Sequence, residues 1–368
     1  MKIVLFANSD WYLYNYRLAL ASYLRAQGNE VILLSPSGKY VPKLQAEGFA
    51  WHAVEFSRDS LNPFRELRVV WKLRKLLKQI QADVLHNFTL KSVLYGSLAA
   101  KHTHVRKVLN AITGRGYLFL NESRKTNFAR TLVIPLLRYA LRDSQIIFQN
   151  MNDLDFFTSK RLASAAQCFF IPGSGVDVEK FKPHMRRKSG TPIVALCARM
   201  LWEKGVGEFA EAAQIVQARR KKVRFVLVGS ADPGNPSSVP LETLQHWNDE
   251  GILEWWGWRD DMVEVYQSAS LVCLPSYYGE GLARSLLEAA ACGVPIITTD
   301  IPGCRDIVQP DISGFLVPAR DAKALADSIM VAIEHPDLLV EMGARGRELI
   351  VKRYSQEIVN SETYQLYL

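Results

Sequence analysis

Residues 271 to 299 alternate between apolar runs and a helical pattern, and this alternation restricts the possible fold more than any other stretch. The apolar run Leu271–Pro275 leads into a glycine-bearing turn, a helical pattern follows, and Gly293 precedes a second apolar run, Val294–Thr299. Strand, loop, helix and strand in this order predict a right-handed crossover between parallel strands. The loop and the helix N-terminus then lie at the carboxyl edge of the sheet, where backbone N–H groups favour phosphate.

Two carboxylates belong to this crossover: Glu280 in the turn and Glu288 in the helix, with seven residues between them. Acids at a phosphate-binding edge suit a ligand that carries hydroxyls as well as phosphates, as a sugar nucleotide does. Set in EGLA, LLEA and CGVPII, the pair resembles the EX7E element of retaining glycosyltransferases of the GT-B fold, family 4 type. The resemblance implies that Glu280 contacts the transferred sugar and Glu288 the ribose. The alternative is a solvated helix residue at Glu288 and a helix-dipole partner at Glu280.

Length and composition predict two globular domains, because 368 residues with 48% apolar side chains suffice for two cores. The five cysteines show no CxxC spacing, which favours buried thiols in a reducing compartment over disulfides or zinc ligation. The N-terminal apolar run is too short for a signal peptide, and no segment is as long as a membrane span. We therefore expect a cytoplasmic protein.

Positive charge is concentrated in the first half. Residues 1–180 contain 25 Lys and Arg against 13 Asp and Glu, a net charge of +12, whereas the remainder has 20 against 24, a net charge of −4. Such asymmetry predicts that the first half meets an anionic partner.

Two basic and apolar stretches indicate which partner. Residues 64–81 carry six basic residues and one acid among apolar residues at helical spacing, and residues 123–142 form a second such stretch. A membrane-facing helix and a core helix with a solvated basic face remain equal alternatives for the first. We expect Trp71, Leu73, Leu76 and Leu77 to insert into a bilayer only if their face is free of the core. Nucleic acid is less favoured, because no binding motif occurs.

The first half continues the strand and helix alternation. Lys2–Ala7 predicts a strand and Tyr14–Gln27 the helix after it, which leaves Asn8–Tyr12 as a loop at the ligand edge. The resembling family often has paired glycines here, whereas this chain has NSDWY, so Ser9 or Asp10 is expected to face the sugar or the acceptor.

Two further short strands, Asp83–His86 and Lys107–Ile112, each precede a polar or glycine-rich turn. The resemblance implies that both turns line the cleft and that the second often presents a histidine. Here Thr113, Gly114, Arg115 and Gly116 occupy it, a pattern associated with family members that extend lipid-linked or surface glycans. His86, a lone histidine at a strand end, remains open between a cleft residue and a structural one.

Asp153 and Asp155 form a D-x-D, which binds a divalent ion in glycosyltransferases of the other major fold. We interpret the stretch instead as a helix start, with Asn152 or Asp153 as the N-cap and acids in the first turn. No metal is therefore predicted.

The second half begins after a polar segment at 182–192 and restarts with the strand Ile193–Ala198. Arg199 and Lys204 follow it and match the basic pair that holds the donor diphosphate in the resembling family; surface charges are the alternative. Phe225–Gly229 and Ile252–Arg259 predict further strands. The family grips the base in the loop after the latter, where Trp258 can stack on it and Arg259 approach it, while Trp255 and Trp256 are expected in the core.

Together these features predict an α/β protein of two doubly wound, Rossmann-like domains facing a cleft. Residues 1–180, joined by a C-terminal helix at 355–368, would bind the acceptor, and residues 190–354 the nucleotide sugar. Donor contacts are expected from Gly281, Leu282 and Ala283 at the helix N-terminus as well as from the residues above.

By resemblance the protein is a metal-independent, retaining bacterial glycosyltransferase. It would use an NDP-sugar, with a UDP-sugar favoured, and a polyprenyl-diphosphate-linked or other membrane glycan acceptor at the anionic inner face of the membrane. The alternatives are a GT-B relative such as a non-hydrolysing epimerase or a phosphorylase, and a basic nucleic-acid-binding protein.

Overall fold

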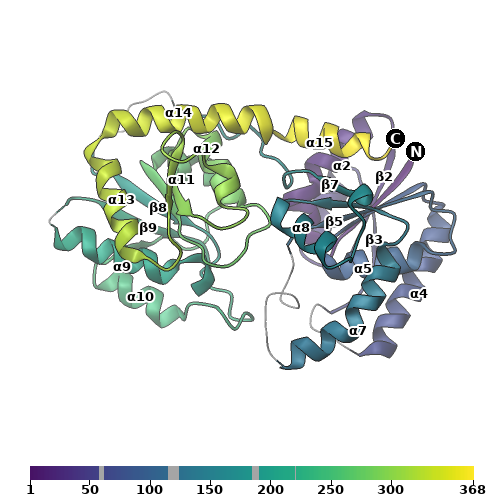
Figure 1. The fold of residues 1–368 in the computed structure, drawn as a ribbon. Helices are drawn as coiled ribbons and strands as arrows, with labels where there is room; N and C mark the ends of the chain where they lie inside the picture. The colour runs from purple at the N-terminus through teal and green to yellow at the C-terminus, as the bar shows by residue number, and fades with distance from the viewer. Residues whose placement is uncertain (58–61, 115–123, 185–189, 220) are drawn as a thin grey trace. The chain divides into compact units, whose positions relative to one another are not determined.

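The computed structural model describes residues 1–57, 62–114, 124–184, 190–219 and 221–368, which form two α/β units (Figure 1). The first unit contains Met1–Ser174 and Gln356–Leu368, and the second contains Gly175–Ser355. Each unit has one parallel sheet with helices packed on both faces. The predicted fold class is thus confirmed.

The first unit has a seven-stranded sheet in the order β3-β2-β1-β4-β5-β6-β7. Its strands are β1 (Lys2–Phe6), β2 (Glu30–Ser35), β3 (Ala50–Ala53), β4 (Val84–Phe88), β5 (Lys107–Ile112), β6 (Gln145–Phe148) and β7 (Cys168–Phe170). Its helices are α1 (Asp10–Tyr12), the π-helix η1 (Leu13–Arg17), α2 (Leu18–Ala26), α3 (Val41–Ala46), α4 (Pro63–Ile80), α5 (Leu90–Ala100), α7 (Arg124–Leu141), α8 (Met151–Ser159), the 3₁₀ turn η2 (Ala165–Gln167) and α15 (Gln356–Gln365). The strand order reverses between β1 and β4, which is the switch point where open α/β sheets bind ligands.

Both faces of this sheet carry an apolar core. Helices α2 and α15 cover one face, where the rings of Tyr23 and Tyr364 meet edge to face with their centres 6.1 Å apart. Both chain ends lie beside these two helices (Figure 1). Helix α4 covers the other face through Val70, Leu73 and Leu77. Burial of such side chains contributes about 1.5–3 kcal/mol each.

The second unit has a six-stranded sheet in the order β10-β9-β8-β11-β12-β13. Its strands are β8 (Ile193–Cys197), β9 (Arg224–Val228), β10 (Glu254–Trp255), β11 (Leu271–Leu274), β12 (Ile296–Thr299) and β13 (Gly314–Val317). Its helices are the 3₁₀ turns η3 (Trp202–Lys204) and η4 (Arg305–Ile307) and the α-helices α9 (Val206–Ala218), α10 (Leu241–Asp249), α11 (Met262–Ser268), α12 (Arg284–Ala291), α13 (Ala322–Glu334) and α14 (Pro336–Arg353). Here the order reverses between β8 and β11.

The helix after β1 and the strand over Ile252–Arg259 differ from their predicted extents. The helix after β1 begins at Asp10 and not at Tyr14, because the Ser9 hydroxyl accepts the Tyr12 N–H at 3.2 Å and caps it. The predicted loop Asn8–Tyr12 is therefore largely helical. The strand predicted over Ile252–Arg259 is only Glu254–Trp255. Gly257 turns the chain at φ 64°, and its carbonyl accepts a hydrogen bond from the Gly229 N–H.

Candidate active site

The loops after β8 and β11 are held together at the switch point of the second unit. Gly205, at φ 75°, ends η3, and a Cβ there would overlap the Pro275 carbonyl oxygen. The Tyr277 N–H donates to the Glu203 carbonyl at 3.1 Å, and the buried Ser276 hydroxyl lies 2.8 Å from the same oxygen. Only glycine permits this approach, and it brings the two loops into contact.

That contact places Lys204 beside Glu280. The ammonium group forms an ion pair with Glu280 Oε1, and the Ser276 hydroxyl lies 3.1 Å from the same oxygen. Both charged side chains are largely buried, at 18% and 16% exposed. The Glu280 backbone is fixed by its N–H bond to the Pro302 carbonyl at 3.3 Å. A cation and a carboxylate thus lie together at the predicted ligand edge.

Glu288 lies on α12 with both carboxylate oxygens engaged. The Tyr266 hydroxyl donates to Oε2 at 3.1 Å, and Arg284 Nε donates to Oε1 at 2.8 Å. Burial, followed by the charge of Glu288, raises the pKa of Tyr266 well above its usual range, so the phenol stays a hydrogen-bond donor. Glu288 is 12% exposed and is not the solvated helix residue of the alternative interpretation.

The N-terminus of α12 has no side-chain cap, because its N-cap residue is Ala283. First-turn N–H groups of such a helix are suited to a phosphate. The Ala283 N–H, predicted as a donor contact, instead donates to the Gly303 carbonyl at 3.0 Å. Gly281 and Leu282 are partly exposed in the preceding turn.

Arg199 and Lys204 follow the same strand but have different partners. Arg199 Nη1 lies 2.9 Å from Asp232 Oδ2, and its side chain is 59% exposed. Lys204 is paired with Glu280. Within the described ranges the two basic groups share no carboxylate, so a common diphosphate would have to replace two separate ion pairs.

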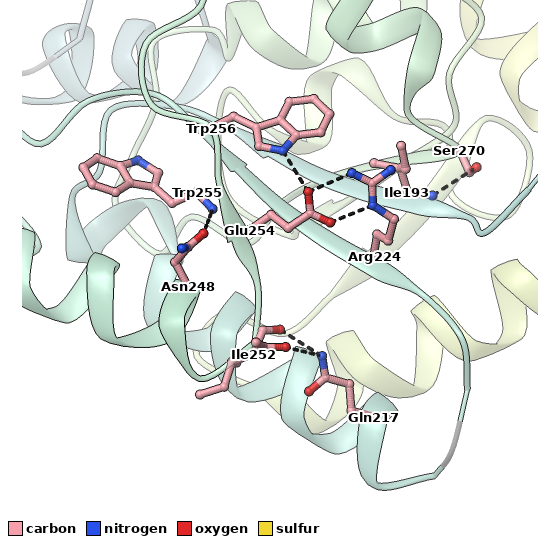
Figure 2. Close-up of polar contacts among 10 residues, drawn as sticks. Ile193, Gln217, Arg224, Asn248, Ile252, Glu254, Trp255, Trp256 and Ser270 are labelled. Atoms are coloured by element: carbon pink, nitrogen blue, oxygen red, sulfur yellow. Dashed lines mark hydrogen bonds and ion pairs between the residues drawn. The ribbon is translucent and has the colours of Figure 1, made fainter.

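The tryptophan-rich segment after β9 divides into buried and exposed side chains. Trp255 and Trp256 are partly buried against the cores, as predicted, and Figure 2 shows Glu254 between Arg224 and the Trp256 indole. The Arg224 guanidinium holds the pKa of Glu254 below its usual value. Trp258 is exposed with its indole N–H 3.0 Å from Asp260.

Arg259 forms a bidentate pair with Asp261, two residues along the chain. A base ligand at this loop would therefore meet an exposed indole and a guanidinium already held by a carboxylate.

In the first unit, Ser9 and Asp10 hold backbone groups. Ser9 caps the helix, and the buried Asp10 carboxylate accepts the N–H groups of Trp11 at 2.8 Å and Tyr40 at 2.7 Å. A Cβ at Gly38 would overlap this carboxylate. The carboxylate thus fixes the turn after β2.

His86 is not at a strand end, as predicted, because β4 continues to Phe88. Its side chain is 1% exposed, and Nδ1 lies 2.5 Å from the Tyr367 hydroxyl. Burial, followed by the charge of Arg17, lowers the pKa of His86 well below its usual value. The imidazole is therefore neutral. Thr113 and Gly114 follow β5 and are partly exposed, whereas Arg115 and Gly116 lie outside the described residues.

The D-x-D stretch begins a helix, but its predicted cap residue is wrong. Asn150 is the N-cap of α8 and accepts the Asp153 N–H at 2.8 Å, because Met151 already has helical geometry. The Asn150 amide also lies 3.1 Å from Asp153 Oδ2. Among the described residues, no group of three or more His, Cys, Asp or Glu is arranged to hold a metal.

Helix α4 separates the apolar residues that the sequence had grouped. Leu73 and Leu77 are buried in the core and Leu76 packs against it, so the condition set for their insertion into a bilayer, a face free of the core, is not met for these three residues. Trp71 is exposed, together with Phe64 and Leu67. In the described part of the chain, no helix is long and apolar enough to span a bilayer.

No role is predicted from the sequence for three residues whose side chains contact the candidate site residues or lie near them: Arg17, Tyr266 and Ser276. Ser276 directly follows the apolar run before the EX7E turn, a signal that could have found it. Tyr266 and Arg17 sit in ordinary helical patterns, and only the packing reveals them.

Comparison with known proteins gives the family. The model described as glycosyl transferases group 1 matches residues 177–349, and the model described as glycosyl transferase 4-like matches residues 2–151. The N,N'-diacetylbacillosaminyl-diphospho-undecaprenol alpha-1,3-N-acetylgalactosaminyltransferase of Campylobacter jejuni is 30% identical over 100% of this chain and 98% of its own length. The UDP-Gal:alpha-D-GlcNAc-diphosphoundecaprenol alpha-1,3-galactosyltransferase of Escherichia coli is 24% identical over 80% of this chain and 78% of its own.

Solved structures share the fold. A glycosyltransferase from Rickettsia africae has a TM-score of 0.81 at 18% identity and covers 100% of this chain and 97% of its own. The Anabaena protein HepE, solved in complex with UDP and glucose, has a TM-score of 0.80 at 18% identity, with 99% and 98% covered. With two matching family models and a relative that is 30% identical over the whole of this chain, the chain belongs to the family 4 type glycosyltransferases and is an enzyme of that class.

Proposed function

We propose that this glycosyltransferase moves a sugar from an NDP-sugar, with a UDP-sugar favoured, to a sugar linked to a polyprenyl diphosphate, with retention of the anomeric configuration. The observation that carries the donor assignment is the Lys204 and Glu280 pair at the switch point, beside the uncapped N-terminus of α12. The activities of the Campylobacter and Escherichia relatives support the acceptor class. The complexes of HepE support UDP as the nucleotide.

In the proposed reaction, the bond between the anomeric carbon and the donor diphosphate breaks. A bond forms from that carbon to an acceptor hydroxyl oxygen, and the hydroxyl proton passes to the departing diphosphate. Negative charge develops on the diphosphate, where Lys204, Arg199 and the N–H groups of α12 would stabilise it. Glu280 would orient the transferred sugar, and Glu288 the ribose.

Donor binding would require the observed ion pairs to rearrange. Lys204 would exchange Glu280 for a phosphate oxygen, and Arg199 would exchange Asp232. Glu280 would then be released toward the sugar hydroxyls. No metal takes part in this proposal, because two cations and a helix terminus supply the positive charge.

We also propose that the first unit docks on the anionic inner face of the membrane through α4. Phe64, Leu67 and Trp71 are 80%, 66% and 62% exposed and recur at helical spacing on one face. Exposed Arg68, Lys72 and other basic residues of the helix flank them. Each basic residue near an acidic leaflet contributes about 1 kcal/mol, so docking would be peripheral and salt-sensitive.

Transfer is tested by incubating the protein with a panel of UDP-, GDP- and dTDP-sugars and a polyprenyl-diphosphate-linked N-acetylhexosamine. Mass spectrometry of the lipid should show one added sugar with one donor class, and NMR of the product should show the donor's anomeric configuration. Inversion would contradict retention. Absence of product with every donor, despite binding of a nucleoside diphosphate, would contradict the acceptor.

Membrane docking is tested by co-sedimentation with vesicles that contain anionic lipid. Reversal of the charges at Arg68, Lys72 and Lys75 should lower binding and slow transfer to a lipid acceptor without changing donor affinity. Reversal of three exposed charges of the second unit, Lys222, Lys323 and Arg353, is the matched control and should leave sedimentation unchanged. If the wild type ignores such vesicles at low salt, the docking proposal is wrong.

A further inference from the structure

Arg17 is a buried cation with an unsatisfied donor. It is 5% exposed and ends the π-helix that follows β1. Its Nη2 donates to the Tyr12 hydroxyl at 2.8 Å, and its guanidinium carbon lies 4.3 Å from the centre of the Phe88 ring. The Nε group is buried and has no hydrogen-bond partner in the described part of the chain. π-Helical turns of this kind are frequent at functional sites.

Among the described residues, the charge of Arg17 also lacks a counterion. Within the ranges that the structure describes, no carboxylate forms an ion pair with it. Phe88 supplies the π face of its ring, and Tyr12 supplies a ring face and a neutral hydroxyl. These groups hold a cation less strongly than an anion would. Buried arginines are almost always paired, because an uncompensated buried charge is costly. An anion from outside the chain would remove that cost.

His86 offers a second unsatisfied group against the same aromatic ring. Its Nε2 is buried without a partner among the described residues, and its ring centre lies 4.0 Å from that of Phe88. If the Tyr367 hydroxyl donates to Nδ1, the ring proton is on Nε2 and one donor is unsatisfied. The opposite tautomer would also leave the Tyr367 proton without an acceptor, so the first arrangement is favoured. Nε2–H is then a donor, which suits an anion.

The position of these groups in the sheet is that of a ligand site. β1 and β4 are neighbours, and the strand order reverses between them. Arg17 follows β1, and Phe88 is the last residue of β4, so their contact lies at the carboxyl edge of the switch point. In the second unit, the equivalent neighbours β8 and β11 bring Lys204 to Glu280. In both units, a cation after the first strand therefore meets a residue that ends or follows the neighbouring strand.

We propose that Arg17 and His86 form a phosphate-binding site that takes the diphosphate of the lipid-linked acceptor, an inference that rests on the proposed function for its choice of acceptor. Tyr12 is partly exposed, and its hydroxyl occupies a guanidinium donor. The entering phosphate oxygen displaces this hydroxyl and accepts from Arg17. The site distinguishes a sugar held on a diphosphate from the same sugar on an uncharged carrier.

Calorimetric titration with inorganic pyrophosphate and with farnesyl diphosphate tests the site. Arg17→Gln should weaken both at least tenfold while UDP binds within twofold of wild type. Arg25→Gln is the control, since Arg25 lies in the same unit and donates to the Glu47 carbonyl. Equal affinity of wild type and Arg17→Gln for both diphosphates would overturn the site. A loss confined to UDP would assign the anion to the donor and overturn the acceptor assignment.

Tyr12→Phe covers the case in which Arg17→Gln does not fold. It keeps the ring and removes the competing hydroxyl, so pyrophosphate should bind more tightly; unchanged or weaker binding overturns the site. In transfer assays, Arg17→Gln should raise the KM for a diphosphate-linked acceptor and leave kcat/KM for an uncharged glycoside unchanged. Equal effects on both acceptors would show a structural role. If pyrophosphate binding depends on Arg17 but no lipid diphosphate is glycosylated, the phosphate-binding site at Arg17 is supported and the proposed acceptor is wrong.

Discussion

Glu280→Gln is expected to tighten the binding of a nucleoside diphosphate while it strongly slows transfer. In the free enzyme Lys204 is paired with Glu280, so a phosphate must displace that carboxylate. The amide keeps the shape of the side chain and removes the competing charge. A charge-assisted hydrogen bond contributes about 1.5–3 kcal/mol when buried. With 18% and 16% of the two side chains exposed, we discount the contribution to about 1 kcal/mol.

About 1 kcal/mol corresponds to roughly fivefold tighter binding. Transfer should fall by on the order of a hundredfold or more, because the group that orients the sugar is lost. Calorimetry with UDP measures the first effect and the lipid transfer assay the second. Glu203→Gln, in the neighbouring loop, is the control and should change neither. UDP affinity equal to or weaker than wild type would refute the competition between Glu280 and phosphate for Lys204.

Three further changes test other parts of the site. Tyr266→Phe removes a hydrogen bond to the Glu288 carboxylate, so urea denaturation should show an unfolding free energy lower by about 1.5–3 kcal/mol. Nucleotide affinity should also fall, and an unchanged affinity would argue against a ribose role for Glu288. Because the pKa of His86 is lowered in the folded state, its contribution to stability is present above about pH 6.5 and is lost as the pH falls below that value, by up to about 1.4 kcal/mol per pH unit. In His86→Gln, the unfolding free energy should therefore depend less steeply on pH. An unchanged slope would exclude a buried, neutral His86. Transfer should survive exhaustive EDTA treatment. Complete loss, restored by manganese or magnesium, would contradict metal independence and indicate Asp153 and Asp155 as metal ligands.

Strands buried on both faces could be predicted from the sequence with little error. The runs Glu30–Ser35 and Lys107–Ile112 match β2 and β5 residue for residue, because parallel strands covered by helices are continuously apolar. The run at Ile252–Arg259 is also rich in apolar residues, but it does not form a strand over its whole length. Only Glu254–Trp255 is a strand, Trp256 packs from the segment after it, and Trp258 is exposed. The positive φ of Gly257 is compatible with a turn and not with a strand.

The candidate site was predictable as a set of residues but not as a set of contacts. EX7E and the basic residues after β8 drew attention to Lys204 and Glu280 separately, but their pairing depends on the fit of Gly205 against the Pro275 carbonyl. A contact across 76 positions has no local signature in one sequence. Arg17 was missed for the same reason, since an arginine in a helical pattern is usually solvated.

Helix α4 shows a different limit. Its apolar spacing predicted an amphipathic helix, and the helix is present. Which of its apolar residues are exposed depends on which side of the helix packs against the sheet. Leu73 lies in the core, whereas Trp71 and Leu67 are exposed. The spacing of apolar residues in the sequence does not distinguish those that are buried from those that are exposed.

A crystal structure of the protein with a bound nucleoside diphosphate would show which groups hold the phosphates and the ribose. We predict that the phosphates lie against Lys204 and the N-terminus of α12, that Glu280 no longer pairs with Lys204, and that the ribose hydroxyls meet Glu288. A nucleotide bound away from these groups, with the Lys204 and Glu280 pair intact, would contradict this prediction.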